Sequence, residues 1–355
     1  MPDEVEVKST SRMKFPGISP RAYEHPADRG ALASLRAVPG FAQVLRAVSG
    51  FYTERGERLM ALASHIRVGP KQYPALDRIR NQCAETLDLE AVPNLFVARN
   101  AQAQAWSIGI DEPFIVVTTG LLDLMDAEGL RWAVGHEMGH VLSGHAVYQT
   151  MLIRLIGIQA SMSFMPVSAL GIRVIIAALH EWYRKAELSC DRAGLLCSQD
   201  PTSTLRAQIQ LAGGIDPSQV DIPSFLQQAS EYESVDDIRD SFHKLRFVET
   251  QSHPFAVVRS AQLQKWAASP EYRDILAGNY PRRTDDEPSS TWKEDVKAAA
   301  KSYKDSFTES TDPLAKVFSD VGEAVAGAAG KVWNKFGNNG NGNGGNGGNG
   351  GDGTA

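Results

Sequence analysis

One segment places two imidazoles and a carboxylate on an otherwise apolar helix, and this segment limits most strongly what the chain can fold into. It reads His136-Glu137-Met138-Gly139-His140. On a helix, positions four apart are rotated by only about 40°, so both imidazoles point to one side. Positions 132–134 and 141–142 are apolar, and His and Glu are costly to bury there unless they are paired or bound to a metal. The sequence therefore predicts a buried helix with a metal site.

The residue types of this segment suit zinc chemistry. Two neutral imidazoles bind Zn²⁺ at about 2.0–2.1 Å each. Glu137 directly follows the first histidine, where it can act as general base toward a water molecule. A chance match on a polar helix face is the alternative. The apolar surroundings and a preceding β-branched segment, 114–118, favour the metal site.

A catalytic zinc site also needs a third protein ligand and one open position. The metzincin pattern requires Gly seven and His ten residues after the first His. This chain has Ser143 and Ala146 at those positions, which excludes that class. His145, nine residues after His136, is expected on the opposite helix face, where we interpret it as structural or solvated. His180 is a competing ligand, with a structural role favoured.

A second candidate for the third ligand lies in the segment 183–194. Glu187 and Asp191 are four residues apart and share a helix face. Glu187 as a ligand and Asp191 as the partner of a zinc-bound histidine form a coherent pair. The charge pattern with Arg184 and Lys185, taken alone, favours a solvated helix face instead. The residues themselves leave both interpretations open.

Three segments, in order along the chain, resemble the HtpX-like zinc peptidases, the family that includes the CAAX prenyl endopeptidases. They read TTGLLDLMDAEGLRWAVGHEMGHVLSGH, RKAELSCDRAG and SHPFAVVR. The resemblance covers about residues 93–266, roughly half of the chain. It implies an α+β, predominantly helical domain of the gluzincin type, with a small sheet beside the HExxH helix and one Zn²⁺ per chain.

The same resemblance implies roles for individual residues. His136, His140 and Glu187 are then the zinc ligands, and Glu137 is the catalytic base. Asp191 is the residue that orients a ligand histidine.

Two further residues match the family near its metal. His253 corresponds to a histidine that either stabilises the tetrahedral oxyanion or, when neutral, occupies the open metal position and holds the enzyme off. A helix-capping role is the alternative for His253. Arg259 matches the family's arginine.

The chain also departs from the family. It has Gln104 where the family usually has Asn before the second strand, so a contact with substrate backbone there is in doubt. Many relatives carry clear membrane spans. The nearest candidate here, 155–172, has no charge but contains Pro166, and it predicts a helical hairpin broken near that proline. Prenylated substrates are therefore not expected.

Composition restricts the partners and the compartment. A net charge of −6 argues against nucleic-acid binding. Three cysteines, none in a Cys-x-x-Cys pair, indicate a reducing compartment. Cys190 and Cys197 are interpreted as small buried residues. No secretory signal is recognised at the N-terminus, so we expect a cytoplasmic protein. Peripheral membrane association or contact with a partner, through 151–180 or 314–336, is an open alternative.

The chain is expected to have four parts. Residues 1–35 form an extended arm, and residues 36–285 form the peptidase domain, with strands at 94–98 and 114–118 and a helix capped by Asp126. Residues 286–336 form a linker and an amphipathic helical segment. Residues 337–355, rich in Gly and Asn, are expected to be disordered.

These patterns predict a zinc endopeptidase that hydrolyses unfolded or extended polypeptides. A role in protein quality control is the biological hypothesis that goes with this activity. The substrate is expected to lie along the strand at 114–118 as an added strand. The alternative is a latent or inactive metal-binding scaffold at a membrane surface. The segment 151–180 is expected to cover the cleft, contact lipid or form a subunit interface.

Overall fold

The computed structural model of the chain describes residues 12–37, 41, 55–161, 168–213, 216–234 and 256–286. The chain divides into two compact units, Met1–Asp312 and Pro313–Ala355, and every described residue belongs to the first. The helical segment expected at 314–336 and the Gly/Asn tail lie outside the described residues.

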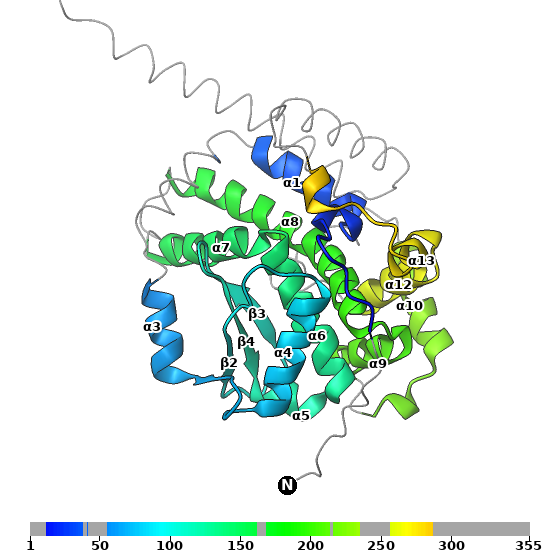
Figure 1. The fold of residues 1–355 in the computed structure, drawn as a ribbon. Helices are drawn as coiled ribbons and strands as arrows, with labels where there is room; N and C mark the ends of the chain where they lie inside the picture. The colour runs from blue at the N-terminus through cyan, green and yellow to red at the C-terminus, as the bar shows by residue number, and fades with distance from the viewer. Residues whose placement is uncertain are drawn as a thin grey trace, which may run out of the picture. The chain divides into compact units, whose positions relative to one another are not determined.

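A four-stranded mixed sheet forms one side of the first unit (Figure 1). The strand order is β1-β2-β4-β3. β2 and β4 run parallel, while β1 and β3 pair antiparallel with β2 and β4 respectively. The strands are β1 (Ile66–Arg67), β2 (Leu95–Ala98), β3 (Ala105–Ile108) and β4 (Phe114–Thr118). The two predicted strands are thus β2 and β4, and they are the two inner ones.

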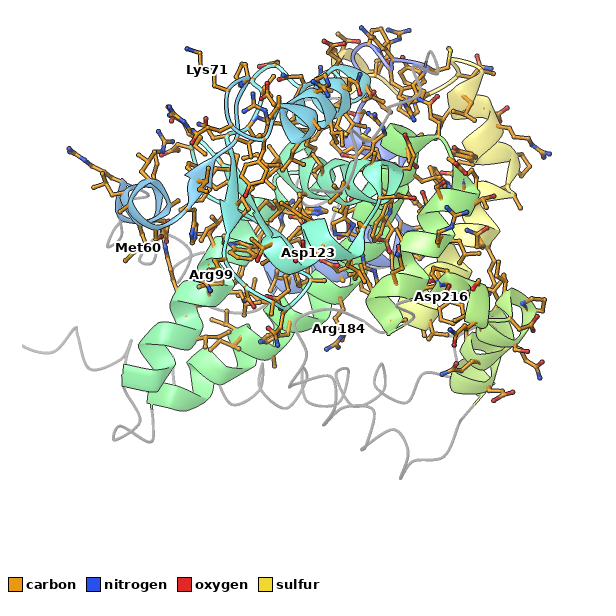
Figure 2. The ribbon with its side chains drawn as sticks, turned by 90° about the horizontal axis from the view of Figure 1, so that it is seen from below. Met60, Lys71, Arg99, Asp123, Arg184 and Asp216 are labelled. Carbon is orange, nitrogen blue, oxygen red and sulfur yellow. The ribbon has the colours of Figure 1, made fainter. Side chains whose placement is uncertain are left out.

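Both faces of the inner strands are buried, which explains why their sequences are continuous apolar runs. One face joins the main core with α4 (Pro74–Thr86) and α6 (Ala127–Leu142). The other face packs against Ala61 of α3 (Arg55–Ser64). The side of α3 away from the sheet carries exposed apolar side chains, and Met60 lies at the periphery of the molecule (Figure 2).

The helix with the HExxH segment, α6, lies against α8 (Ser168–Ser198). Asp126 caps the N-terminus of α6 by accepting a hydrogen bond from the Gly129 amide at 2.8 Å, as predicted. Glycines bring the two helices close together. A methyl group at Gly135 would lie 2.6 Å from Cβ of Cys197, and one at Gly194 would lie 2.6 Å from the Trp132 ring. Larger residues at these two positions would separate α6 from α8.

The apolar segment after the site forms two helices, α7 (His145–Ser161) and α8. Their apolar side chains pack together in a cluster that includes Met151, Leu155 and Leu179. The two helices agree with the predicted hairpin, and residues 162–167 between them, with Pro166, are not described. None of the described helices is long and apolar enough to cross a membrane.

The other main elements of the described residues are helices. Four described helices, α9, α10, α12 and α13, follow α8 (Figure 1), and a short helix, α5, links β4 to α6. Their bounds are α5 (Thr119–Leu124), α9 (Pro201–Ala212), α10 (Ile222–Ser234), α12 (Ala256–Ala267) and α13 (Pro270–Leu276). Helix α12 contacts α8, α9 and α10, and this position brings it to the helix that carries Glu187.

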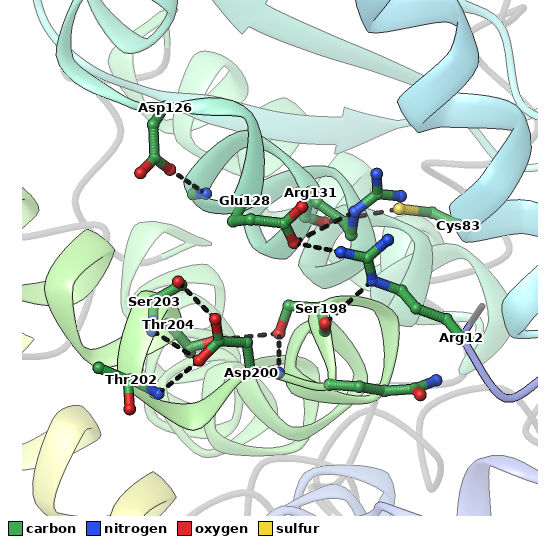
Figure 3. Close-up of polar contacts among 12 residues, drawn as sticks. Arg12, Cys83, Asp126, Glu128, Arg131, Ser198, Asp200, Thr202, Ser203 and Thr204 are labelled. Carbon is green, nitrogen blue, oxygen red and sulfur yellow. Dashed lines mark hydrogen bonds and ion pairs between the residues drawn. The ribbon is translucent and has the colours of Figure 1, made fainter. Parts of the chain in front are cut away.

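The N-terminal residues are part of the domain, so the expectation of an extended arm over 1–35 is wrong for the described residues from 12 onward. Residues Pro26–Ala37 form helix α1, which packs on α8. Phe15 and Tyr23 lie in the main core. Arg12 donates hydrogen bonds to Glu128 on α6 at 2.7 Å and to the Ser198 carbonyl of α8 at 3.1 Å (Figure 3). Scattered core positions without a period explain why the sequence does not reveal this packing.

Candidate active site

Three side chains from two helices converge at one buried point. His136 and His140 of α6 approach each other with their Nε2 atoms 3.2 Å apart. Glu187 of α8 places Oε1 at 3.2 Å from His140 Nε2 and Oε2 at 3.5 Å from His136 Nε2. The edge of a tetrahedron around a zinc ion with bonds of 2.0–2.1 Å is about 3.3–3.4 Å. The observed contacts come close to this edge but involve both oxygens of Glu187, so they are not three edges of one face. One ligand atom of each residue lies within 4.8 Å of the other two, and the three residues together could hold a metal ion.

The cluster is held from behind by a carboxylate and a guanidinium. Asp191, one turn after Glu187, contacts His136 Nδ1 with Oδ1 at 3.1 Å. Arg259 of α12 donates to both oxygens of Asp191, at 2.8 and 2.5 Å. It also lies 2.8 Å from Glu187 Oε2. The Asp191 contact sets the orientation of the His136 ring and leaves Nε2 free to face a metal.

The charges of this cluster shift the pKa values of its members. Burial alone would lower the pKa of His136, but Glu187 and Asp191 outweigh burial and raise it to about 10. Burial alone would raise the pKa of Asp191, but Arg259 holds it below the ordinary value. The carboxylates of Glu187 and Asp191 thus favour a positive charge at the His136 ring. They would attract a bound cation for the same reason.

Glu137 lies beside the cluster and faces a cavity. It is 3% exposed, and its Oε2 atom has no hydrogen-bond partner among the described residues. The cavity has a volume of about 370 Å³ and is lined by Glu137, His136 and Glu187 together with residues of β3, α9 and α12. A carboxylate with one unpaired oxygen at a cavity wall beside a metal site is placed to accept a proton.

The strand that borders this cavity is β3, and the expectation that substrate adds to the strand at 114–118 is wrong. That strand, β4, is hydrogen-bonded to β2 on one side and β3 on the other. β3 is one of the two edge strands, and its first residue, Ala105, lines the cavity together with Gln104. An added strand requires an unpaired edge, and in the described sheet β3 is the edge next to the site.

His145 lies behind the cluster rather than on an opposite helix face. Gly144 adopts a φ of 71°, which ends α6 and restarts the chain in α7 at His145. His145 is 3% exposed, its ring lies 5.4 Å from that of His140, and its Nδ1 lies 3.6 Å from the Cys190 sulfur. Burial lowers the pKa of His145 and raises that of the Cys190 thiol, so both are neutral.

Asp28 lies beside His145 in the same buried region, where its carboxyl is costly to ionise. Ser189 Oγ donates to Asp28 Oδ2 at 2.6 Å, and His145 Nε2 lies 3.5 Å from the same oxygen. Burial raises the pKa of Asp28 to about 7 despite the hydrogen bond from Ser189. The folded protein therefore binds a proton that the unfolded chain, with a pKa of about 3.9, has already released. Stability is lost as pH rises from about 4 to about 7.

Asp28→Asn is expected to stabilise the protein at alkaline pH because a neutral amide replaces a buried charge. The free energy of unfolding should exceed that of the wild type by up to about 4 kcal/mol at pH 8, falling to roughly 1–2 kcal/mol at pH 5. Denaturant titrations at both pH values measure the difference. Asp77→Asn, which removes a carboxylate paired with Arg80 at 2.8 Å, is the control and should give no such gain. A gain for Asp28→Asn that is equal at both pH values would contradict the assignment.

Three further residues singled out from the sequence are His253, His180 and Cys197. His253 lies outside the described residues, so its role stays a prediction. His180 belongs to neither of the two groups of possible metal ligands found among the described residues. Cys197 is fully buried against α6, away from the cluster, in accord with a packing role.

Sequence reasoning missed three residues that the structure places at the site. Tyr183 stacks on His140 with ring centroids 5.6 Å apart, and its place one turn before Glu187 on α8 is the signal that was available. Ala105, at the start of the edge strand, lies in a four-residue strand too short to recognise. Gln208 lines the cavity from α9, and nothing in the local pattern indicates it.

The fold and the site together define an α+β metallopeptidase. Residues 70–267, more than half of the chain, match the model of peptidase family M48, and the chain belongs to this family. It is 32% identical over 270 residues to the plastoglobule-localized metallopeptidase 48, chloroplastic, of Arabidopsis thaliana, an alignment that covers 74% of this chain and 77% of the relative.

A second relative is a protease HtpX homolog of Thermoanaerobacter pseudethanolicus. It is 26% identical over 109 residues, which is 30% of this chain and 36% of that relative. No solved structure matches the chain.

Proposed function

We propose that the protein is a zinc endopeptidase with one Zn²⁺ held by His136, His140 and Glu187. The observation that carries the proposal is that one ligand atom from each of these three buried residues lies within 4.8 Å of the other two, as a shared zinc ion requires. Glu137 lies beside these residues, and its Oε2 atom has no partner among the described residues. This supports catalysis over a purely structural site, because a structural zinc site needs no base and has no open position.

The residues of the chain divide the catalytic work. A zinc ion held by His136, His140 and Glu187 would supply Lewis-acid chemistry toward a scissile carbonyl and a water molecule. Glu137 accepts the proton of the attacking water and delivers it to the leaving amine. Asp191 and Arg259 act through their contacts to His136 and Glu187, and they keep both groups in position.

We further infer that substrates bind in extended form. A polypeptide segment that adds antiparallel to β3 would pass over the cavity at Gln104 and Ala105, beside Glu137. This mode requires free backbone groups, so it favours unfolded chains, and a role in protein quality control is the matching biological proposal. Compartment and natural substrate stay predictions.

Zinc content and hydrolysis measured side by side test the proposal. Wild type reconstituted with Zn²⁺ is expected to hold about one ion per chain and to cleave labelled casein. Glu187→Ala is expected to lose zinc affinity by more than the 10–100-fold typical of a residue that only supports a ligand. Glu181→Ala, which removes a carboxylate paired with Arg184 on the same helix, should keep both properties.

The outcomes separate the proposal from its alternative. A wild type that holds zinc but hydrolyses no polypeptide would favour the metal-binding scaffold. A wild type that binds no zinc after reconstitution would refute both. Full zinc retention in Glu187→Ala would keep a metal site and move its third ligand elsewhere.

We propose peripheral lipid contact through α7 as a second property of this peptidase. Ile153 and Ile156, three apart on one helix face, are 47% and 42% exposed. The first relative is named for a localisation at plastoglobules. Ile153→Ser combined with Ile156→Ser is expected to reduce co-sedimentation with phosphatidylcholine vesicles about tenfold or more. Val92→Ser, at another exposed apolar position, is the control, and equal co-sedimentation of all three proteins would reject the contact.

A further inference from the structure

The cavity beside the three candidate ligands is lined by a buried amide that has no hydrogen-bond partner among the described residues. Gln208 of α9 is 2% exposed and lines this cavity. Its Oε1 and Nε2 atoms are both buried, and neither has a partner in the described part of the chain. Buried polar groups are nearly always hydrogen-bonded. An amide with two unpaired atoms at the wall of an active-site cavity therefore points to a ligand that pairs with it.

The wall around Gln208 is apolar and close to the metal cluster. Leu211 and Ala212, three and four residues further along α9, line the same cavity. Trp132 and Ala133 line it from α6, and Ala133 is less than one helical turn before His136. The same cavity is lined by His136, Glu137 and Glu187, so a substrate held at these residues can place a neighbouring side chain in the part lined by Gln208. The charged side chains lining the cavity, among the described residues, are Glu137, Glu187 and Arg259, with the His136 ring beside them.

We propose that Gln208 forms the floor of a substrate side-chain subsite that selects Asn or Gln next to the scissile bond. The inference rests on the proposed endopeptidase function and names a substrate class for it. A carboxamide offers one acceptor and two donors, as Gln208 does, so two amides can exchange a pair of hydrogen bonds.

Other side chains fit this subsite less well. An apolar side chain of the same size would leave both amide atoms of Gln208 buried and unpaired. A charged side chain at this position would be buried against the neutral amide of Gln208, which offers no opposite charge. Sites built to hydrogen-bond a substrate group discriminate strongly against analogues that lack the group.

The test uses pairs of peptide hydroxamates, whose hydroxamate binds zinc. The two members of a pair differ only in one side chain, Asn or the isosteric Leu, and one pair is made for each side of the hydroxamate. Their dissociation constants are measured by calorimetry on the zinc-loaded full-length protein. In one of the two pairs, the wild type is expected to bind the Asn member about tenfold or more tightly.

Two variants locate the effect. Gln208→Met, of similar length and without hydrogen-bonding atoms, is expected to lose the preference for Asn and to favour Leu. Gln210→Met should behave like the wild type, because the Gln210 amide already donates to the Leu124 carbonyl at 2.9 Å and does not line the cavity. Gln208→Met is also expected to unfold at an equal or higher temperature, since it removes a buried unpaired amide; an amide with a merely structural role would lower that temperature.

The possible failures are distinguishable. Equal affinity for Asn and Leu members in both pairs, or a preference that survives in Gln208→Met, overturns the subsite and leaves the endopeptidase intact. Failure of every hydroxamate to bind the zinc-loaded protein refutes an open metal position, and the proposed function then fails together with the subsite.

Discussion

Glu137→Gln is expected to keep zinc and to lower kcat for polypeptide hydrolysis by about 10²–10⁴-fold, the range for loss of a general acid–base group. The physical reason is that the amide cannot accept the proton of the attacking water. Zinc retention is expected because Glu137 lies outside the group formed by His136, His140 and Glu187. Hydrolysis rates and metal content are measured on the same reconstituted samples.

A control variant and a stability measurement accompany this prediction. Glu128→Gln, on the same helix but paired with Arg12 and outside the cavity, is the matched control and should retain activity. Glu137→Gln should also be at least as stable as the wild type, since its Oε2 atom is buried without a described partner and a neutral group is cheaper to bury. Hydrolysis by Glu137→Gln at the wild-type rate would remove the assigned base.

The second large effect is expected from Arg259→Met. This substitution leaves the buried carboxylates of Glu187 and Asp191 without their guanidinium partner. Breaking a buried ion pair by removing one partner costs about 3–5 kcal/mol. In the zinc-loaded protein the ion compensates part of the negative charge that Arg259 no longer balances, so the loss of stability should be smaller. Denaturant unfolding of the metal-free and the zinc-loaded variant measures both values.

A matched substitution elsewhere separates the metal site from ion pairs in general. Arg154 is 7% exposed and binds both oxygens of Glu57 at about 3 Å, far along α7 from the cluster. Arg154→Met should lower stability by the same amount with and without zinc. Equal losses for Arg259→Met in the two states would contradict a role of Arg259 in balancing the charge of the metal ligands.

The parts of the fold that the sequence predicted depend on local patterns. Asp126 caps its helix through its own side chain, and the spacing of His136 and His140 on one helix is sufficient to bring their rings together. The inner strands are recognised because both of their faces are buried and their residues are continuously apolar. Glu187 required the family resemblance, because its charged neighbours suggest a solvated face although it is fully buried.

The features that the sequence did not predict depend on contacts between distant segments. The edge position of β3 is decided by the order of strands in the sheet and not by the sequence of the strand. His145 was misplaced because the turn at Gly144 interrupts the helix, although a glycine after a helix is a known stop signal. Phe15 and Tyr23 enter the core through packing against segments that lie far along the chain.

The position of Arg259 in the chain has a consequence for biosynthesis. The residues proposed to bind and activate the metal lie between positions 136 and 191, but their counter-charge comes from α12, the penultimate α-helix of the described domain. Chains emerge from the ribosome N-terminal end first. A partly synthesised chain thus carries the ligands before it carries the arginine that makes their burial favourable. Assembly of the catalytic centre is therefore expected to be a late event, after most of the domain has left the ribosome.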